Sequence, residues 1–454
     1  MLRGGVYMGL RQGLAVGINF GGVLLLTRAI GPGNYGLYSG ALGVFTFLQL
    51  LAQMGVGVYL LRREGEVREA IYHQAFTLLL VSGAVGVSLA LLGLPFLERW
   101  VRLTDFGSVA LVLFLGLPVA LSTEVPLARL GRALAFKRVA VVELVGLSAF
   151  YATAVPLALA GLGVAAPLVG WWVQQLLLLI LLFYAARYSP RLHWDFVLAK
   201  EMISYGSRYS VSNWIWQLRD LVNPLVVGRF LGAEAVGYVA LTMRLLKGLA
   251  FVKEAVWRIS LAALARVQHD RTRLVRMVTE GMNLQLIAAG PLLVAFGLVA
   301  PRIVPLLFGT EWLRVLEVYP FLALGTLTSA VFMLHASTLY VLGQNLKVGV
   351  FHLVHIALFA GAAFLLVPRL GLVGYGWAEV AALGSYAVLH VILARVIGTP
   401  AYGLVAVWWA ASASALFVYQ LGWWAALGLI AIAVWPRTWR ELGGYWKALH
   451  AGKA

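Results

Sequence analysis

Four charged side chains share one face of a predicted helix within residues 236–260. Arg244, Lys247, Glu254 and Arg258 are spaced at i, i+3, i+10 and i+14, and a helix brings such positions to one side. Arg244 and Lys247 are expected near the centre of an apolar stretch, where inserting a cation costs about 2.5 kcal/mol or more. Neither has a carboxylate one turn away. We therefore expect both to face a hydrated cavity and bind an anionic substrate, while Glu254 and Arg258 could clasp each other as an inner gate.

A second polar stripe lies in the preceding apolar stretch, residues 205–229. It contains Tyr205, Arg208, Ser212, Trp216, Arg219 and Asn223, with Asn213, Gln217 and Asp220 on the adjacent stripe. Such side chains avoid lipid and face a cavity or partner helices. Two interpretations stay open: a solvated wall in which Arg208, Arg219 and Asn213 bind substrate, or an Arg219–Asp220 network that holds helices together. Pro224 is expected to weaken the helix near its outer end.

Neutral polar side chains occupy the corresponding helix of the first half. Subtracting 201 from the residue number places Lys247 on Thr46 and Glu254 on Gln53, and Thr46, Gln49 and Gln53 form their own stripe. Both halves thus present a polar face from the equivalent helix, so Gln49 and Gln53 are expected to join the substrate-binding surface. Transport could be coupled to a proton or sodium gradient. Asp220, Glu254 and Glu379 are the candidates for ion coupling, and Glu254 with Arg258 for a gate.

Two short motifs do not indicate cofactor sites. Residues 31–36 fit the dinucleotide pattern G-x-G-x-x-G, but no strand precedes them and the equivalent residues 232–237 lack the middle glycine. A tight turn between helices is expected instead. His352 and His355 are three residues apart without an evident third ligand, and the chain has no cysteine. We therefore expect no metal, no bound cofactor and no catalytic residue.

Composition identifies the elements that must position these groups. Of 454 residues, 62% are hydrophobic and only 12% are charged, too few to cover a soluble surface. Apolar runs of about 20 residues, the length that crosses the hydrocarbon core as a helix, recur throughout. The sequence predicts an all-α polytopic membrane protein with about fourteen transmembrane helices. Their approximate spans are 8–29, 37–60, 74–96, 106–127, 139–160, 164–186, 205–229, 236–260, 278–300, 316–341, 348–367, 373–395, 403–419 and 421–436. The last two are short and could form a re-entrant pair.

The charge distribution predicts the orientation. The chain has 35 basic and 18 acidic residues, and the basic residues cluster in short segments between apolar runs, which indicates membrane topology rather than nucleic-acid binding. Most of them fall on the inner side if the N-terminus is cytoplasmic. We therefore expect a multi-pass protein of the prokaryotic cytoplasmic (inner) membrane, with both termini in the cytoplasm and no cleavable signal peptide.

The chain repeats itself at an offset of 201. Arg28, Gly31 and Gly36 correspond to Arg229, Gly232 and Gly237, and a second match in the same order, at an offset of 212, pairs residues 130–132 with residues 342–344. Such parallel repeats are related by a pseudo-twofold axis along the membrane normal, with a site between them. The repeat predicts a lobe at residues 1–200 with helices one to six and a lobe at 201–397 with helices seven to twelve. Residues 398–454 would add two helices and a basic cytoplasmic tail.

Glycines recur at every fourth position of the first predicted helix, at residues 5, 9, 13, 17 and 21. Two interpretations stay open. The glycines could let helices approach closely, or they could let the helix bend during a transport cycle, since each glycine costs about 1 kcal/mol of helix propensity.

Three motifs occur in order along the chain: the turn from Arg28 to Tyr38, Leu307-Phe-Gly309-x-x-Trp312, and residues 342–345 followed by Val367-Pro-x-x-Gly371-x-x-Gly374. Together they resemble the polysaccharide-biosynthesis flippases of the O-antigen and exopolysaccharide repeat-unit type, within the multidrug/oligosaccharidyl-lipid/polysaccharide exporter superfamily. The resemblance covers essentially the whole chain. It implies two six-helix bundles in a V around a central cavity, and a cationic cavity that Arg208, Arg219, Arg244 and Lys247 would fit.

The implied function is export of a lipid-linked oligosaccharide and not an enzymatic reaction. The substrate would be an undecaprenyl-pyrophosphate-linked repeat unit, moved from the inner to the outer leaflet by alternating access for cell-surface polysaccharide synthesis. The expected partners are this polyprenyl-pyrophosphate-linked glycan, membrane lipid and the polysaccharide polymerase machinery. A cation-coupled multidrug or small-molecule efflux antiporter of the same fold would need an acidic cavity to bind cationic drugs. A membrane glycosyltransferase or polymerase would want carboxylates in the first outer loop, which residues 29–36 lack.

Overall fold

The structure is a computed structural model that describes residues 2–250, 260, 263–436, 438, 439 and 443. These residues form helices and short connections, without a strand among them. The chain divides into two compact units, Met1–Ala240 with Leu307–Trp312, and Leu241–Leu306 with Leu313–Ala454. The first unit extends past residue 200 because the helix Phe196–Gln217 packs on Val56–Arg62 and Glu69–Val101. The lobe boundary at residue 200 follows the repeat and stays a prediction.

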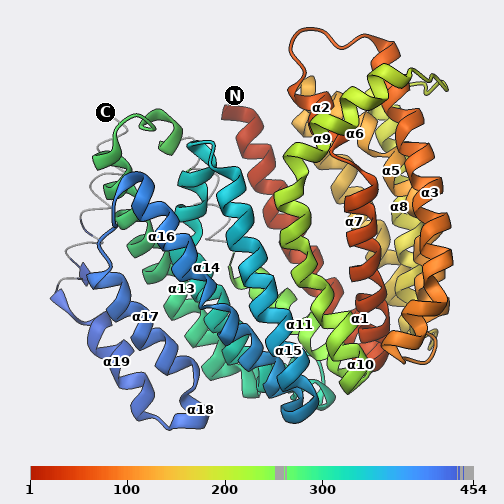
Figure 1. Ribbon diagram of the computed structural model, residues 1–454. Helices are drawn as coiled ribbons and strands as arrows, with labels where there is room; N and C mark the ends of the chain where they lie inside the picture. Colours follow the sequence, from red (N-terminus) through yellow and green to blue (C-terminus); the bar gives the residue numbers. More distant parts are fainter. Residues whose placement is uncertain (1, 251–259, 261–262, 437, 440–442, 444–454) are drawn as a thin grey trace. The chain divides into compact units, whose positions relative to one another are not determined.

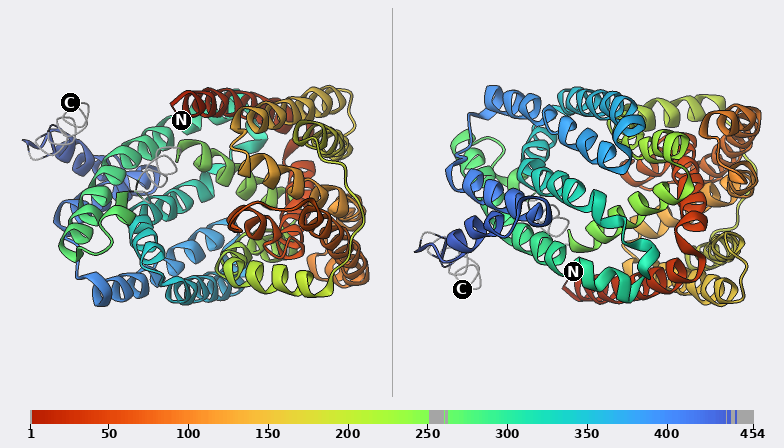
Figure 2. Two further views of the ribbon diagram at one scale, coloured as in Figure 1. Left: turned by 90° about the horizontal axis from the view of Figure 1, so that it is seen from above. Right: turned by 90° about the horizontal axis from the view of Figure 1, so that it is seen from below.

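The first unit begins with long apolar helices interrupted at glycine or proline. Figure 1 shows the helices along their length, and Figure 2 shows them end-on. The helices are α1 (Leu2–Ala52), α2 (Val56–Arg62), α3 (Glu69–Val101), α4 (Phe106–Phe114), α5 (Leu117–Ser122), α6 (Glu124–Arg132), α7 (Phe136–Leu159), α8 (Ala165–Ala186), α9 (Phe196–Gln217), the 3₁₀ turn η1 (Leu218–Leu221), the π turn η2 (Asn223–Val227) and α10 (Gly228–Leu231). Helix α11 (Ala233–Leu249) starts in this unit, which also holds the 3₁₀ turn η3 (Thr310–Trp312). Its core includes the fully buried Leu79, Phe106 and Phe114.

The second unit is built from helices of the C-terminal half. They are α13 (Arg271–Leu307), α14 (Val315–Val341), α15 (Asn345–Ala382), α16 (Ser385–Ile397), α17 (Gly403–Leu416), α18 (Val418–Leu421) and α19 (Trp424–Ala433). Helix α14 packs against α15, α16 and α17, and α17 packs against α19. The fully buried Phe359 and Tyr375 lie on α15 with their rings in edge contact, so α15 supplies much of this core.

The chain is a multi-pass membrane protein. Among the described residues, eight helical stretches are long and apolar enough to cross a membrane. The stretches Gly13–Ala52 and Asn345–Ile397 contain 40 and 53 residues, about twice the length that one crossing needs. Each bends at a glycine with a left-handed φ, 73° at Gly31 and 63° at Gly371, where the sequence predicts a turn between two spans. The last two helices are short, as expected, and the total of fourteen spans stays a prediction.

The two copies of the repeat adopt one backbone conformation at the turn that they share. Gly31 has φ 73° and ψ 172°, and Gly232 has φ 89° and ψ 179°. The two turns also touch. A Cβ added to Gly36 would collide with the carbonyl of Ala233, and one added to Gly237 would collide with the carbonyl of Pro32. Because residue numbers 32 and 36 become 233 and 237 on adding 201, the contact is reciprocal, as a pseudo-twofold axis requires.

The arginine that precedes each turn is used in the same way in both copies. Arg28 Nη1 donates to the carbonyl of Leu307, the last residue of α13, at 3.3 Å. Arg229 Nη1 donates to the carbonyl of Trp100 in the last turn of α3 at 2.7 Å, with its guanidinium 4.2 Å from the Trp100 ring centroid. Both arginines therefore bind carbonyls that a helix end leaves free, and the glycine-rich turn is a packing element.

The predicted glycine ridge of α1 does not pack closely in this structure. A Cβ added to Gly13, Gly17 or Gly21 would have no described heavy atom within 4 Å, whereas one added to Gly22 would enter the Tyr151 ring. On the side that faces α7 the helix presents Gly22 instead of these three glycines, and the close-packing interpretation of the ridge stays a prediction. The bending interpretation stays a prediction.

Candidate functional site

Predicted span 7 is interrupted where its polar stripe is densest. Helix α9 ends at Gln217 and is followed by η1, η2 and α10. Pro224 has no N–H to donate to the carbonyl of residue 220, and its ring excludes a regular α-helical turn there, so the chain widens into a π turn. The weakening predicted at Pro224 is confirmed. Interrupted helices within a membrane commonly mark substrate or ion sites, because their backbone polar groups are available.

The interruption carries two of the predicted site residues. Arg219 and Asp220 lie in η1, and both are partly buried. The Arg219 guanidinium carbon lies 5.7 Å from the Trp216 ring centroid, a geometry that stabilises a cation. Asn223 Nδ2 donates to the carbonyl of Val236 at 3.2 Å and thereby holds the interruption against α11. Arg208 and Asn213 lie on α9, where both side chains are exposed.

The paired cations of α11 differ in exposure. Arg244 and Lys247 lie three residues apart on one face of a regular helix, as the sequence predicts. Arg244 is partly buried and interacts with neighbouring groups, while Lys247 is exposed. Lys247 is thus the more accessible cation of the pair. Glu254 and Arg258, predicted as a gate or coupling pair, lie outside the described residues.

The polar face of the first half contains a carboxylate that was not among the predicted site residues. Gln49 and Gln53 are partly buried near the end of α1. Gln53 Nε2 donates to Glu124 Oε1 at 2.8 Å, and Glu124 is the first residue of α6. The sequence signal for this site is a single carboxylate within the apolar stretch 106–127. The sequence does not reveal the partner of Glu124, because Gln53 lies 71 residues earlier in the chain.

Glu379 lies in the helical core of the second unit. It is 1% exposed, and its Oε2 is 3.6 Å from the position of a Cβ built on Gly325 of α14.

Tyr402 joins two histidines of the second unit. Its Oη lies 2.6 Å from His335 Nε2 and 2.7 Å from His390 Nδ1. Burial raises the pKa of Tyr402, which precedes α17, to about 12. The Tyr402 hydroxyl therefore stays neutral and ties α14 and α16 to the start of α17.

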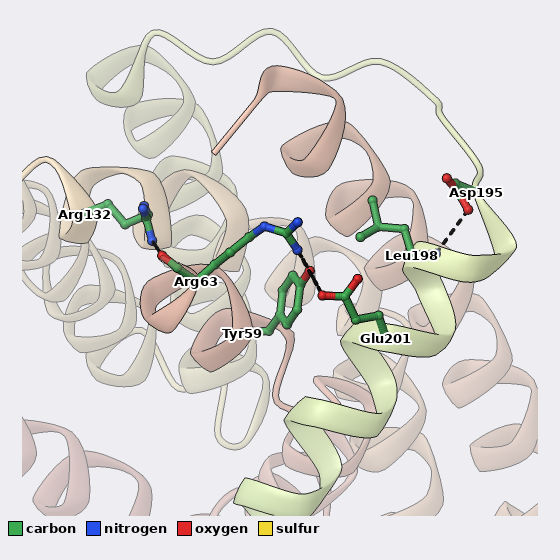
Figure 3. Close-up of polar contacts among 6 residues, drawn as sticks. All are labelled: Tyr59, Arg63, Arg132, Asp195, Leu198 and Glu201. Atoms are coloured by element: carbon green, nitrogen blue, oxygen red, sulfur yellow. Dashed lines mark hydrogen bonds and ion pairs between the residues drawn. The ribbon is translucent and has the colours of Figure 1, made fainter. Parts of the chain in front are cut away.

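Several basic residues of the first unit have structural partners (Figure 3). Tyr59 Oη donates to Glu201 Oε1 at 2.8 Å, and Arg63 Nη1 lies 3.1 Å from the same oxygen. Arg132 Nη1 donates to the carbonyls of Arg63 at 2.7 Å and Leu60 at 2.9 Å. These carbonyls belong to the end of α2, where a helix leaves acceptors unsatisfied. Arg63 and Arg132 thus hold α2 in place.

The start of α9 is fixed beside this cluster. Asp195 is its N-cap: Asp195 Oδ1 accepts a hydrogen bond from the backbone N–H of Val197 at 2.8 Å. It accepts a second from the backbone N–H of Leu198 at 3.1 Å, which Figure 3 shows. Such a cap contributes about 1 kcal/mol. Glu201, one turn further along, then binds Tyr59. The cap and the Glu201 contact together set the direction in which α9 enters the predicted substrate region.

Comparison with known proteins gives a consistent result. Residues 25–317 match the family model described as polysaccharide biosynthesis protein. The amylovoran biosynthesis protein AmsL of Erwinia amylovora is 28% identical over 180 residues, 37% of this chain and 46% of that protein. The succinoglycan biosynthesis transport protein ExoT of Rhizobium meliloti (strain 1021) is 24% identical over 313 residues, 68% of this chain and 63% of that protein. The chain thus spans about half to under two thirds of the length of these relatives.

A solved structure shows the same fold. The lipid II flippase MurJ in its inward closed conformation aligns with a TM-score of 0.74 at 11% sequence identity. The alignment covers 99% of this chain and 100% of that one. The described part of the chain therefore has the fold of a polytopic membrane transporter.

Proposed function

The chain belongs to the polysaccharide biosynthesis protein family, and from this premise we propose that it is a flippase. Its substrate is an undecaprenyl-pyrophosphate-linked oligosaccharide repeat unit, moved from the inner to the outer leaflet of the prokaryotic cytoplasmic membrane by alternating access. The names of its relatives and the shared transporter fold support this proposal. Transport requires no covalent chemistry, so we propose no enzymatic activity.

The observation that carries the proposal is the set of cations on interrupted or solvent-accessible parts of membrane helices. Arg219 lies in the η1 interruption, and Lys247 is exposed on α11. Guanidinium groups bind the oxygens of a pyrophosphate through charge-assisted hydrogen bonds, and an ammonium contributes a compact charge. The sugar head group would cross the membrane while the polyprenyl tail stays in lipid. An inside-negative potential favours export of an anion by about 2.3 kcal/mol per charge per 100 mV.

The remaining parts of the proposal concern orientation, coupling and partners. Both termini face the cytoplasm, where the polysaccharide precursor is made. Asp220, Glu254 and Glu379 are the candidates that the sequence offers for binding a coupling proton or sodium ion, and Glu254 with Arg258, outside the described residues, for an inner gate. The product is delivered to polysaccharide polymerase machinery on the outer side. An efflux antiporter for cationic drugs is less well supported, because the predicted binding residues are predominantly basic.

Removing a single cation tests the proposal. We expect Lys247→Ala to leave membrane abundance near that of the unchanged protein and to lower glycan export about tenfold or more, the loss expected for one hydrogen bond to a charged group. Lys247→Arg should keep much of the export because the charge is retained. Arg244→Ala should also reduce export, with some loss of stability because Arg244 is partly buried. Export is measured in a flippase-deficient strain, with protein level determined in the same membranes.

Lys200→Ala is the matched control, since Lys200 is an exposed lysine near the start of α9. It should export normally. Normal export by both Lys247→Ala and Arg244→Ala would contradict the cationic-site proposal. The substrate class is checked separately by mass spectrometry of lipid that co-purifies with the protein. A polyprenyl-linked glycan supports the flippase, whereas bound cationic drugs in its place would favour the antiporter.

A further inference from the structure

The second predicted span is broken near its inner end. Helix α1 ends at Ala52 and α2 begins at Val56, with Met54 at φ 46° and Gly55 at φ 69° between them. The break frees two carbonyls, and both have new donors. Trp214 Nε1 of α9 donates to the carbonyl of Leu50 at 3.1 Å, and Ser82 Oγ of α3 donates to that of Ala52 at 2.6 Å. Side chains of two neighbouring helices therefore stabilise the break.

Helix α9 touches the break directly. A Cβ added to Gly55 would collide with the backbone of Gly206, and one added to Gly206 would collide with the carbonyl of Met54. Two glycines are thus needed for the backbones to meet. The bend of the second span is consequently coupled by contact to α9, the helix that leads to Arg219 and the η1 interruption.

A carboxylate lies against this break. Glu124 Oε1 accepts a hydrogen bond from Gln53 Nε2 at 2.8 Å. Its Oε2 would be 3.1 Å from a Cβ on Gly57, which has none, so the carboxylate occupies the space beside the α2 backbone. Thr123, between α5 and α6, places Glu124 at the first position of α6. The positive end of that helix makes an ionised form attainable.

The described partner of this carboxylate is an amide and not a cation. In the part of the chain that the structure describes, Glu124 forms no ion pair, and Gln53 is its hydrogen-bond partner. Several charged groups of the elements packed around α6 have other partners. On the α2 side, Tyr59 and Arg63 bind Glu201. On α3, Glu69 binds Arg129, and His73 lies beside Tyr188. On α7, Lys137 and Glu143 have their own partners, and α5 and α8 contain no charged residue.

An ionised carboxylate without a cation is costly inside a membrane protein, by several kcal/mol. Binding a proton removes that cost. A metal cation would need several oxygen ligands, and no group of three or more His, Asp or Glu side chains that could hold one occurs among the described residues. Gln53 suits both protonation states, since its amide N–H can donate to the carboxylate and its amide oxygen can accept from the acid.

We propose that Glu124 is a proton-binding site of the transporter, and that its protonation changes the contact with Gln53 and thereby the bend between α1 and α2. This inference rests on the proposed transport function. In each cycle the Glu124 carboxylate takes up one proton from one side of the membrane and releases it to the other. The α2–α9 contact transmits the change to the predicted substrate region.

Proton binding is tested without substrate. Purified full-length protein in lipid nanodiscs is titrated with acid, and the infrared band of a protonated carboxyl is recorded. We expect a band that Glu124→Gln removes and that Glu143→Gln, a carboxylate change on α7, leaves in place. Glu124→Asp should retain the band, and Gln53→Ala should shift its midpoint pH. A carboxyl band that is the same in correctly folded Glu124→Gln as in the unchanged protein overturns the inference.

Coupling is tested in proteoliposomes at a fixed membrane potential. If one proton moves per substrate, a gradient of one pH unit should change the steady-state glycan distribution about tenfold. Glu124→Gln should lose this response, while Glu143→Gln should keep it. Glycan transport that ignores the pH gradient in the unchanged protein overturns the inference but leaves the flippase proposal intact. The expected infrared result without glycan transport would overturn the flippase proposal and support the proton site.

Discussion

Gly22 and Gly17 show at the scale of single residues how one helix can have a packed and an open side. Gly22 makes room for the Tyr151 ring, and Tyr151 Oη donates to Asn19 Oδ1 at 2.6 Å. Gly17 has no described heavy atom within 4 Å of an added Cβ. We expect Gly22→Ala to destabilise the protein by about 1–3 kcal/mol, the usual cost of overpacking. Gly17→Ala should be neutral or stabilising by up to about 1 kcal/mol, because alanine favours the helix.

The measurement is thermal unfolding of the two purified variants in the same detergent, with the unchanged protein beside them. Both variants replace a glycine of α1 by alanine, so the gain in helix propensity is the same in both. A difference between their melting temperatures therefore reports on packing. Equal melting temperatures for the two variants would contradict the packing seen at Tyr151. A loss of export in Gly17→Ala without a loss of stability would support the interpretation that the ridge bends during transport.

At the scale of elements, the close contact between the two repeat turns can be tested by substitution. Gly36 lies against the carbonyl of Ala233, which is backbone and cannot rotate away. Gly33, three residues earlier, would bring a Cβ only to 3.7 Å from Glu234 Cγ, an ordinary contact. We expect Gly36→Ala to lower stability by about 1–3 kcal/mol and Gly33→Ala to have little effect. Melting temperature and membrane abundance check this.

The same pair of variants tests the dinucleotide pattern, because both glycines belong to it. A phosphate-binding turn would need each of them for close approach to a ligand. A helix turn that packs on its repeat needs only Gly36. Gly33→Ala that is as damaging as Gly36→Ala would therefore contradict the packing account of this element.

At the scale of the whole molecule, the orientation in the membrane can be checked directly because the chain has no cysteine. Ala160 follows α7 and Ala133 follows α6, and both are exposed. We expect an impermeant thiol reagent to label Ala160→Cys in intact cells. Ala133→Cys should be labelled only after the membrane is permeabilised. Strong labelling of Ala133→Cys in intact cells would reverse the predicted topology.

The sequence by itself determined the membrane class, the approximate positions of the long apolar helices and some of their interruptions, although it missed the break between Ala52 and Val56. These depend on local properties: apolar runs of crossing length, Pro224 without an N–H, and Gly31 and Gly371 where the backbone needs a left-handed φ. It also indicated the family through motifs in order along the chain, which the match over residues 25–317 confirms.

The tertiary structure alone decided which side chains meet. Gln53 binds Glu124 across 71 residues, and Arg28 binds the Leu307 carbonyl across 279. The rotation of each helix about its axis sets these contacts, and hydropathy does not reveal it, since lipid is as apolar as the helix faces that it covers. For the same reason the glycine ridge of α1 was predictable as a pattern, while its open side and the packed Gly22 depended on the position of Tyr151 in α7.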